Sequence, residues 1–255
     1  MRILGLIVGF LVVFQVSFSK NIDHITVITL PKSGSLCLIK YLKLLDRLGY
    51  PGYSRVSTWH PEPLYYGLKN GHFSRIEKKI ILVRDLRDMF ISAVHYVSAG
   101  NHFVTSYPVL GDKWPALSLD QKVLELSNYR EQPQHIGYRY KRMHFPQHYK
   151  RQIELAQKLY FQEGSLGVRY EDLSGCLGKK VQFETMKRIN DYLEIEVSEE
   201  HYAYLMENLW GNKEIKSPTF RVGGMNKWKK QLSQQTQKIL WHLYGSYLTS
   251  FGYKQ

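Results

Sequence analysis

A five-residue loop, Pro31–Ser35 (PKSGS), carries the residues best suited to hold a phosphate. Lys32 supplies a positive charge, and Ser33 and Ser35 supply hydroxyl donors. The apolar, β-branched run Ile25–Leu30 before the loop predicts a buried strand. The helix predicted after the loop has apolar residues at helical spacing, namely Leu36, Ile39, Leu42, Leu45 and Leu48. In this order of elements, backbone N–H groups and the positive end of the helix point at the loop, where a phosphate would bind well.

Further candidates for anion binding follow other predicted strands. Lys79–Val83 (KIILV) predicts a buried strand, and Arg84 comes directly after it. Ser92 lies eight residues further on, about two turns along a predicted helix. Arginine suits a phosphate because its planar fork donates two hydrogen bonds to one group. Leu166–Tyr170 (LGVRY) predicts another strand, and its last residue, Tyr170, offers a ring that could stack on a base.

Two side chains after a third predicted strand could take up a proton. Tyr53–Trp59 predicts that strand, and His60 follows it directly. The segment Pro61-Glu62-Pro63 makes a rigid loop at the same place. Histidine suits a general base because its usual pKa of about 6.5 lies near working pH. Glu62 is an alternative base.

Strands that alternate with helices predict an α/β fold with a parallel sheet. Ligands of such sheets bind at the carboxyl ends of the strands. Lys and Arg (35) outnumber Asp and Glu (22), which gives a net charge of +13. This charge favours an anionic partner, whether a phosphorylated cofactor, an acidic glycan, a nucleic acid or a membrane surface. The two cysteines, Cys37 and Cys176, form no metal-binding pattern.

Four segments resemble the motifs of sulfotransferases that use 3′-phosphoadenosine 5′-phosphosulfate (PAPS). PKSGS resembles their PKSGT loop, and ILVRDLRDMFISAVHY, with Arg84 and Ser92, resembles their signature for the 3′-phosphate. LGVRYEDL, with Tyr170, resembles their RYEDL strand end near the adenine. Phe220–Lys230 (FRVGGMNKWKK) resembles their late RKGxxGDWK loop. The residues that match this loop at unchanged spacing are Arg221, Gly223, Trp228 and Lys229.

The resemblance implies a P-loop-like sulfotransferase fold, with a central parallel sheet flanked by helices in three layers. It also implies an enzyme that moves a sulfuryl group from PAPS to a hydroxyl or amine of an acceptor. The acceptor would be a carbohydrate, a phenol or another small molecule, and neither a metal nor a nucleic acid is expected. Lys32 would neutralise charge on the bridging oxygen, and His60 would be the base. The residues expected at the cofactor are Lys32, Ser33, Gly34, Ser35, Arg84, Ser92, Tyr170, Arg221 and Gly223.

Two departures from the family pattern leave other functions open. Leu36 stands where the family has a second Thr, and Cys37 stands where it has an adenine-stacking Trp. Trp210 could supply a replacement face. One alternative is therefore a non-catalytic protein that binds anions on a sulfotransferase-like fold. The other is a nucleotide or sugar kinase, although PKSGS lacks the G-x-x-x-x-G-K-S/T spacing of that class.

Residues Met1–Ser19 predict a signal peptide or signal anchor, and residues 20–255 a single sulfotransferase-like domain. Arg2 precedes the uncharged run Ile3–Phe18, and Ser17-Phe18-Ser19 resembles a cleavage site. We therefore expect a place in the secretory pathway, in the Golgi lumen or associated with a membrane. The cytoplasmic side of a membrane is the alternative. The oligomeric state is left open.

Deleting Met1–Ser19 is expected to leave a soluble protein that unfolds in one cooperative transition. The measurement is a thermal melt of the truncated chain. Aggregation, or a melt without cooperativity, would show that the segment is part of the fold and that the domain boundary is wrong.

Overall fold

The computed structural model describes residues 25–50, 56–59, 78–99, 113–128, 149–209 and 224–255. Within them lies a sheet with strand order β2-β1-β3-β4. The strands are β1 (Ile25–Thr29), β2 (Val56–Trp59), β3 (Lys78–Val83) and β4 (Ser165–Arg169). Every neighbouring pair is parallel. The predicted α/β fold with a parallel sheet is therefore confirmed.

The register brings the carboxyl ends of the strands to one edge of the sheet. Thr29 at the end of β1 pairs with Leu82 of β3. Val83 at the end of β3 pairs with Arg169 at the end of β4. The segments that leave these strands therefore begin side by side, which is where parallel sheets bind ligands.

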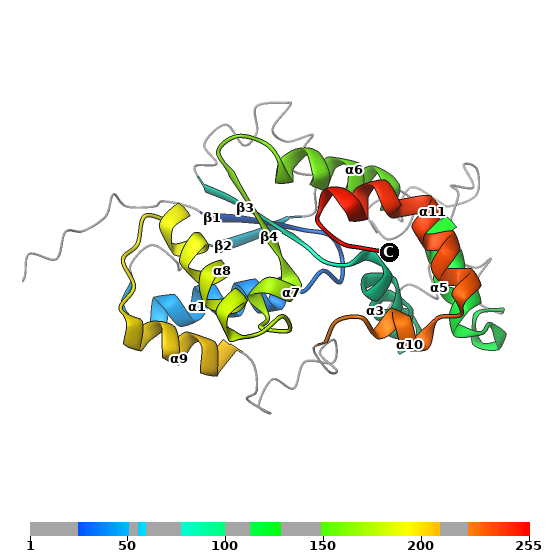
Figure 1. Cartoon of the computed structure of the whole chain (residues 1–255), viewed down its shortest axis with the longest axis horizontal. Helices are drawn as coiled ribbons and strands as arrows, with labels where there is room; N and C mark the ends of the chain where they lie inside the picture. Colours follow the sequence, from blue (N-terminus) through cyan, green and yellow to red (C-terminus); the bar gives the residue numbers. More distant parts are fainter. Residues whose placement is uncertain (1–24, 51–55, 60–77, 100–112, 129–148, 210–223) are drawn as a thin grey trace, which may run out of the picture.

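One face of the sheet is covered by α1 (Ser35–Arg47), α7 (Tyr170–Leu173), α8 (Lys179–Tyr192) and α9 (Glu199–Leu209) (Figure 1). Strand residues that point to this face include Ile25, Val27, Ile80 and Leu82, all fully buried in one core cluster. The spacing of two along each strand is the period of a pleated sheet.

The other face packs against a second group of helices. Ile28, Ile81 and Val83 alternate with the residues of the first face and contact Leu159 and Phe251. These helices are α3 (Leu86–Ser98), α5 (Leu119–Asn128), α6 (Tyr149–Tyr160), α10 (Lys227–Gln231) and α11 (Gln234–Ser250), with a 3₁₀ turn at Trp114–Ala116. Burial on both faces explains why KIILV is an unbroken apolar run. The three layers implied by the family resemblance are confirmed (Figure 1).

The structure shifts the predicted strand boundaries by one residue: β1 ends at Thr29 rather than Leu30, and β3 begins at Lys78 rather than Lys79. Leu166–Tyr170 was expected to be a strand that ends at Tyr170, but β4 spans Ser165–Arg169 and Tyr170 begins α7. The predicted strand Tyr53–Trp59 is present as β2 over Val56–Trp59, and its first three predicted residues lie outside the described part. Within the described residues, no helix is both long and apolar enough to cross a membrane. The predicted leader, Met1–Ser19, lies outside them.

The layer formed by α1, α8 and α9 depends on a buried polar chain. The hydroxyl of Tyr41, which is fully buried, donates to Asn190 Oδ1 at 2.7 Å. Asn190 Nδ2 in turn donates to the Tyr202 hydroxyl at 3.0 Å. Tyr41→Phe would leave the Asn190 carbonyl oxygen buried without this donor. We expect the free energy of unfolding to fall by about 1–3 kcal/mol, measured by urea denaturation.

A matched control is Tyr204→Phe on the exposed side of α9, which should change the free energy of unfolding by less than about 0.5 kcal/mol. Equal effects of the two substitutions would contradict the packing described for this layer.

Candidate functional site

The loop between β1 and α1 is closed by Ser33. Its backbone N–H and its hydroxyl both donate to the Leu30 carbonyl, at 3.1 and 2.7 Å. Ser33 is fully buried, so in this structure its hydroxyl shapes the loop. A direct contact between this hydroxyl and a cofactor stays a prediction. Lys32 and Gly34 both have positive φ, 66° and 92°, and the Gly34 carbonyl accepts the N–H of Cys37 in the first turn of α1.

Gly34 is required by the ring of Tyr170. A Cβ on Gly34 would lie 2.2 Å from Tyr170 Cδ2, which no real contact allows. Tyr170 is 3% exposed, and the guanidinium carbon of Arg84 lies 4.7 Å from the centre of its ring. Burial raises the pKa of the Tyr170 hydroxyl. The ring therefore supports both the loop and Arg84, while its predicted stacking on adenine stays a prediction.

Arg84 connects the two loops that the sequence motifs single out. Its Nη1 donates to the Lys32 carbonyl at 3.3 Å, and its Nη2 donates to the Gly224 carbonyl at 3.1 Å. Arg84 is 9% exposed, and among the described residues its buried Nε–H has no hydrogen-bond partner. An unpaired buried donor costs about 1–3 kcal/mol. Any hydrogen-bond acceptor that reaches this N–H would relieve the cost, and an oxygen of a bound anion is one such acceptor.

Lys32 lies close to helix α3. Its ammonium nitrogen is 4.2 Å from the centre of the Tyr96 ring, and Tyr96 lies one turn after Ser92 on α3. Lys32, Ser92 and Tyr96 are each half-buried. The sequence reasoning did not single out Tyr96. Its spacing of four residues from Ser92 could have identified it, because residues four apart lie on the same face of a helix.

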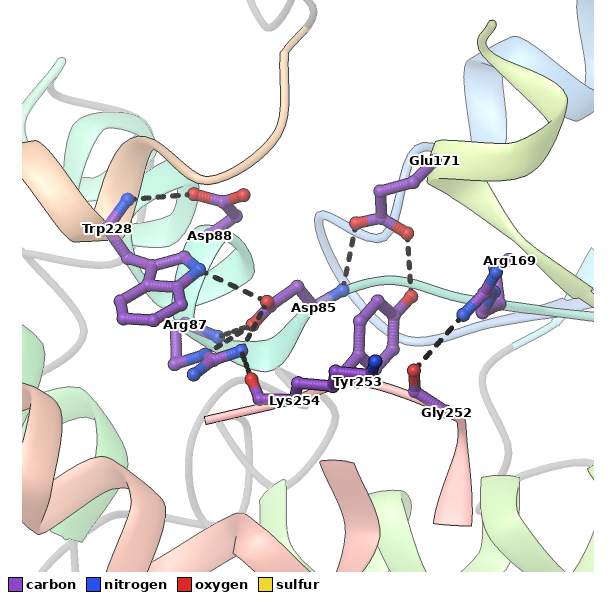
Figure 2. A network of polar contacts seen from close by, with 9 residues as sticks. All are labelled: Asp85, Arg87, Asp88, Arg169, Glu171, Trp228, Gly252, Tyr253 and Lys254. Atoms are coloured by element: carbon purple, nitrogen blue, oxygen red, sulfur yellow. Dashed lines mark hydrogen bonds and ion pairs between the residues drawn. The ribbon is translucent and has the colours of Figure 1, made fainter. Parts of the chain in front are cut away.

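The late loop, named for the motif Phe220–Lys230, is described from Gly224 and ends in helix α10, where two aspartates hold Trp228. The Trp228 backbone N–H donates to Asp88 Oδ1 at 3.1 Å, and the indole N–H donates to Asp85 Oδ2 at 3.2 Å (Figure 2). Lys229 Nζ lies 5.2 Å from the centre of the Trp228 ring. The part of this loop that begins at Gly224 therefore reaches Arg84, as the motif order suggests.

Three buried carboxylates surround the base of the site. The pKa of Asp88 is raised, mainly by burial and further by the negative charge of Asp85. The positive charge of Arg84 opposes this rise in pKa. Burial also raises the pKa of Glu171, while hydrogen bonds from Tyr253 and from the Asp85 N–H oppose it. Asp85 forms an ion pair with Arg87, and the positive charge of Arg84 favours the charged forms of Asp88 and Glu171.

Several predicted residues lie outside the part of the chain that the structure describes. These are His60, Glu62, Trp210, Arg221 and Gly223. The described residues hold no cluster of side chains that could bind a metal ion.

Cys37 and Leu36, the two residues of the first loop and helix that differ from the family pattern, lie in different environments. Cys37 is 4% exposed and packs in the core between α1 and the sheet. It offers no replacement for a stacking ring. Leu36 is 51% exposed in the first turn of α1. Cys37 and Cys176 form no disulfide.

No protein-family model matches the sequence, and no curated protein matches it. Mouse sulfotransferase SULT7A1 was crystallised with PAP, which is 3′-phosphoadenosine 5′-phosphate. It is 14% identical to this chain with a TM-score of 0.62, and the match covers 91% of this chain and 87% of that one. Retinol dehydratase, in complex with androsterone and the inactive cofactor PAP, is 14% identical with a TM-score of 0.59, covering 93% and 84%. The chain therefore has the sulfotransferase fold.

Gly34→Ala tests the contact that shapes the loop. We expect it to lower the free energy of unfolding by about 2–5 kcal/mol, because a left-handed backbone and a clash with Tyr170 act together. Gly49→Ala is the control, since Gly49 also has positive φ (85°) but nothing within 4 Å of an added Cβ. Urea denaturation of both variants gives the comparison. If the two substitutions cost the same, the Tyr170 ring does not constrain Gly34.

Proposed function

We propose that this protein is a sulfotransferase that uses PAPS. It would move the sulfuryl group to a hydroxyl or amine of a small-molecule or carbohydrate acceptor. The observation that carries the proposal is the unpaired, buried Nε–H of Arg84, placed between the Lys32 loop and Gly224 at the carboxyl edge of the sheet. The fold is shared with two proteins crystallised with PAP, the cofactor without its sulfuryl group.

The residues fit a cofactor with phosphate groups at both ends of a ribose. Lys32, Gly34 and Ser35 lie where α1 begins, and the positive end of that helix suits the 5′ side. Arg84 offers a free donor to the 3′-phosphate, with Ser92, Arg221 and Gly223 as the further candidates. Tyr170 supports Arg84 from its ring face. Ser33 would act by closing the loop through the Leu30 carbonyl.

The reaction would use Lys32 and a base. The bond from sulfur to the bridging oxygen of the 5′-phosphate breaks, and a bond from sulfur to the acceptor atom forms. Lys32 would neutralise the charge that builds on the bridging oxygen. The acceptor proton would go to His60, or to Glu62 in its place. No step needs a metal ion in this scheme, and PAPS is the only sulfuryl donor.

A non-catalytic anion-binding role is the second candidate. It is favoured by the burial of Cys37, because an adenine would lack the stacking face that the family usually offers. Base stacking contributes about 1–3 kcal/mol per base in nucleic-acid binders. Such a protein would bind PAP and transfer no sulfuryl group.

The leader predicted at Met1–Ser19 supports a location in the secretory pathway. We place the protein in the Golgi lumen, held at the membrane, because PAPS is imported into that compartment. The cytoplasmic side of a membrane is the alternative.

Arg84→Ala is expected to weaken PAP binding by about 10–100-fold, the value of a charge-assisted hydrogen bond. Binding of adenosine 5′-phosphate, which lacks the 3′-phosphate, should change far less. Isothermal titration of both ligands is the measurement. Equal weakening of the two ligands would refute the assignment of Arg84 to the 3′-phosphate.

His60→Ala is expected to lower turnover by about 10²–10⁴-fold with unchanged PAP affinity, because a base acts on the acceptor. The native rate should rise with pH through the histidine pKa, about 6.5 when unperturbed. Lys32→Ala should impair both turnover and affinity.

The measurement is single-turnover transfer from labelled PAPS to a panel of phenols, sugars and amines. Near-normal transfer by the His60→Ala protein would remove His60 from the mechanism and make Glu62 the next residue to test. Tight PAP binding without transfer to any acceptor would favour the non-catalytic role.

A further inference from the structure

Two segments that are distant in the sequence meet near Asp85, the residue that follows Arg84 and caps helix α3. Helix α3 contributes Arg87, the late loop contributes Trp228, and the C-terminal segment Gly252–Lys254 approaches from the other side (Figure 2). Asp85 is 4% exposed. Its surroundings therefore fix the direction in which the chain leaves β3, and with it the start of the Arg84 side chain.

Arg87 links the C-terminal segment to the late loop. Its Nε and Nη2 donate to the two carboxylate oxygens of Asp85, at 2.9 and 2.8 Å. Its Nη2 also donates to the Lys254 carbonyl at 2.7 Å. The guanidinium carbon lies 3.6 Å from the centre of the Trp228 ring. Arg87 is 3% exposed, so any effect on a ligand has to pass through these neighbours.

Trp228 connects Arg87 and Asp85 to the turn that contacts Arg84. The edge of its indole donates to Asp85, its face lies against Arg87, and its backbone N–H donates to Asp88. Four residues earlier, the Gly224 carbonyl accepts from Arg84 Nη2. A displacement of the Trp228 ring would therefore move the turn that holds one side of the Arg84 guanidinium.

A second connection runs through Glu171. Its Oε2 accepts the Tyr253 hydroxyl at 2.6 Å, and its Oε1 accepts the Asp85 backbone N–H at 3.0 Å. Glu171 is 2% exposed, so both hydrogen bonds are shielded from water. Nearby, Arg169 Nη1 donates to the Gly252 carbonyl at 3.3 Å. The C-terminal segment is thus fastened to the ends of both β3 and β4.

We infer that Tyr253 and Arg87 are positioning residues of the anion site: through Glu171, Asp85 and Trp228, they hold the C-terminal segment against the Gly224–Trp228 turn and so set Arg84 for a 3′-phosphate. This inference rests on the proposed function for the identity of the ligand. Neither side chain touches the ligand in this account. Arginine is needed at position 87, because a lysine has neither the bidentate fork nor the flat face.

The test uses Arg87→Lys, Tyr253→Phe and a matched control, Tyr192→Phe. Tyr192 is half-buried like Tyr253, and its hydroxyl accepts the Lys79 N–H at 2.7 Å near the opposite end of β3. The first readout, amide hydrogen exchange without added ligand, needs no assumption about function. Exchange over residues 224–228 should become about tenfold faster in the first two variants and stay unchanged in the control.

The second readout is the ratio of affinities for PAP and adenosine 5′-phosphate, by isothermal titration. We expect this ratio to fall at least about fivefold in Arg87→Lys and Tyr253→Phe, and to stay at the native value in Tyr192→Phe. A general loss of stability would affect all three variants and would not change the ratio selectively. Tyr253→Phe removes one hydroxyl only, so it keeps the test decisive even if Arg87→Lys fails to fold.

The outcomes separate the two claims. Native exchange over residues 224–228 in Tyr253→Phe would overturn the inference, whatever the protein binds. Faster exchange with a native affinity ratio would overturn the link to the 3′-phosphate. If the unaltered protein binds no PAP, the proposed function fails, and the exchange data alone decide whether the C-terminal segment holds the turn.

Discussion

The site depends on one buried cation, the guanidinium of Arg84. A cation that is removed from water needs acceptors around it, and the fold supplies them as two backbone carbonyls, those of Lys32 and Gly224. One carbonyl belongs to the first loop of the domain and the other to the last. The Tyr170 ring supports the guanidinium from its face. Arg84 thus joins three segments, and among the described residues its Nε–H has no hydrogen-bond partner.

The parallel sheet makes this arrangement possible. β3 lies between β1 and β4, so the residue after β3 emerges between the loop after β1 and the helix after β4. Close approach then requires a residue without a side chain at Gly34, since the Tyr170 ring occupies the space of its Cβ. The buried carboxylates Asp85, Asp88 and Glu171 lie near Arg84 and Arg87. Buried ion pairs are weak evidence for stability, because removing the charges from water can cost more than their attraction contributes.

Local patterns in the sequence predict the strands, the loop and the position of Arg84 at the end of β3. The six residues KIILVR are sufficient, because an unbroken apolar run predicts a strand buried on both faces and the arginine follows it directly. The buried role of the Ser33 hydroxyl was not visible in this way. A serine in a polar loop looks the same whether it faces a ligand or the carbonyl of Leu30.

Contacts between distant parts of the chain could not be predicted. The Tyr253–Glu171 pair spans 82 positions, and no local pattern marks a tyrosine near the chain end as a partner of a buried carboxylate. Arg87 looked like an ordinary charged residue in the first turn of a helix, yet it is buried against Trp228. Cys37 was noted as a missing stacking face, but only packing shows that it belongs to the core.

The central claim is that this edge of the sheet binds a nucleotide with a 3′-phosphate. Isothermal titration of the unaltered protein with PAP and with adenosine 5′-phosphate tests it most directly. The account predicts saturable binding of PAP that is at least about tenfold tighter than binding of adenosine 5′-phosphate, the value of one charge-assisted contact. Equal affinity for the two ligands, or no binding of PAP, would contradict it.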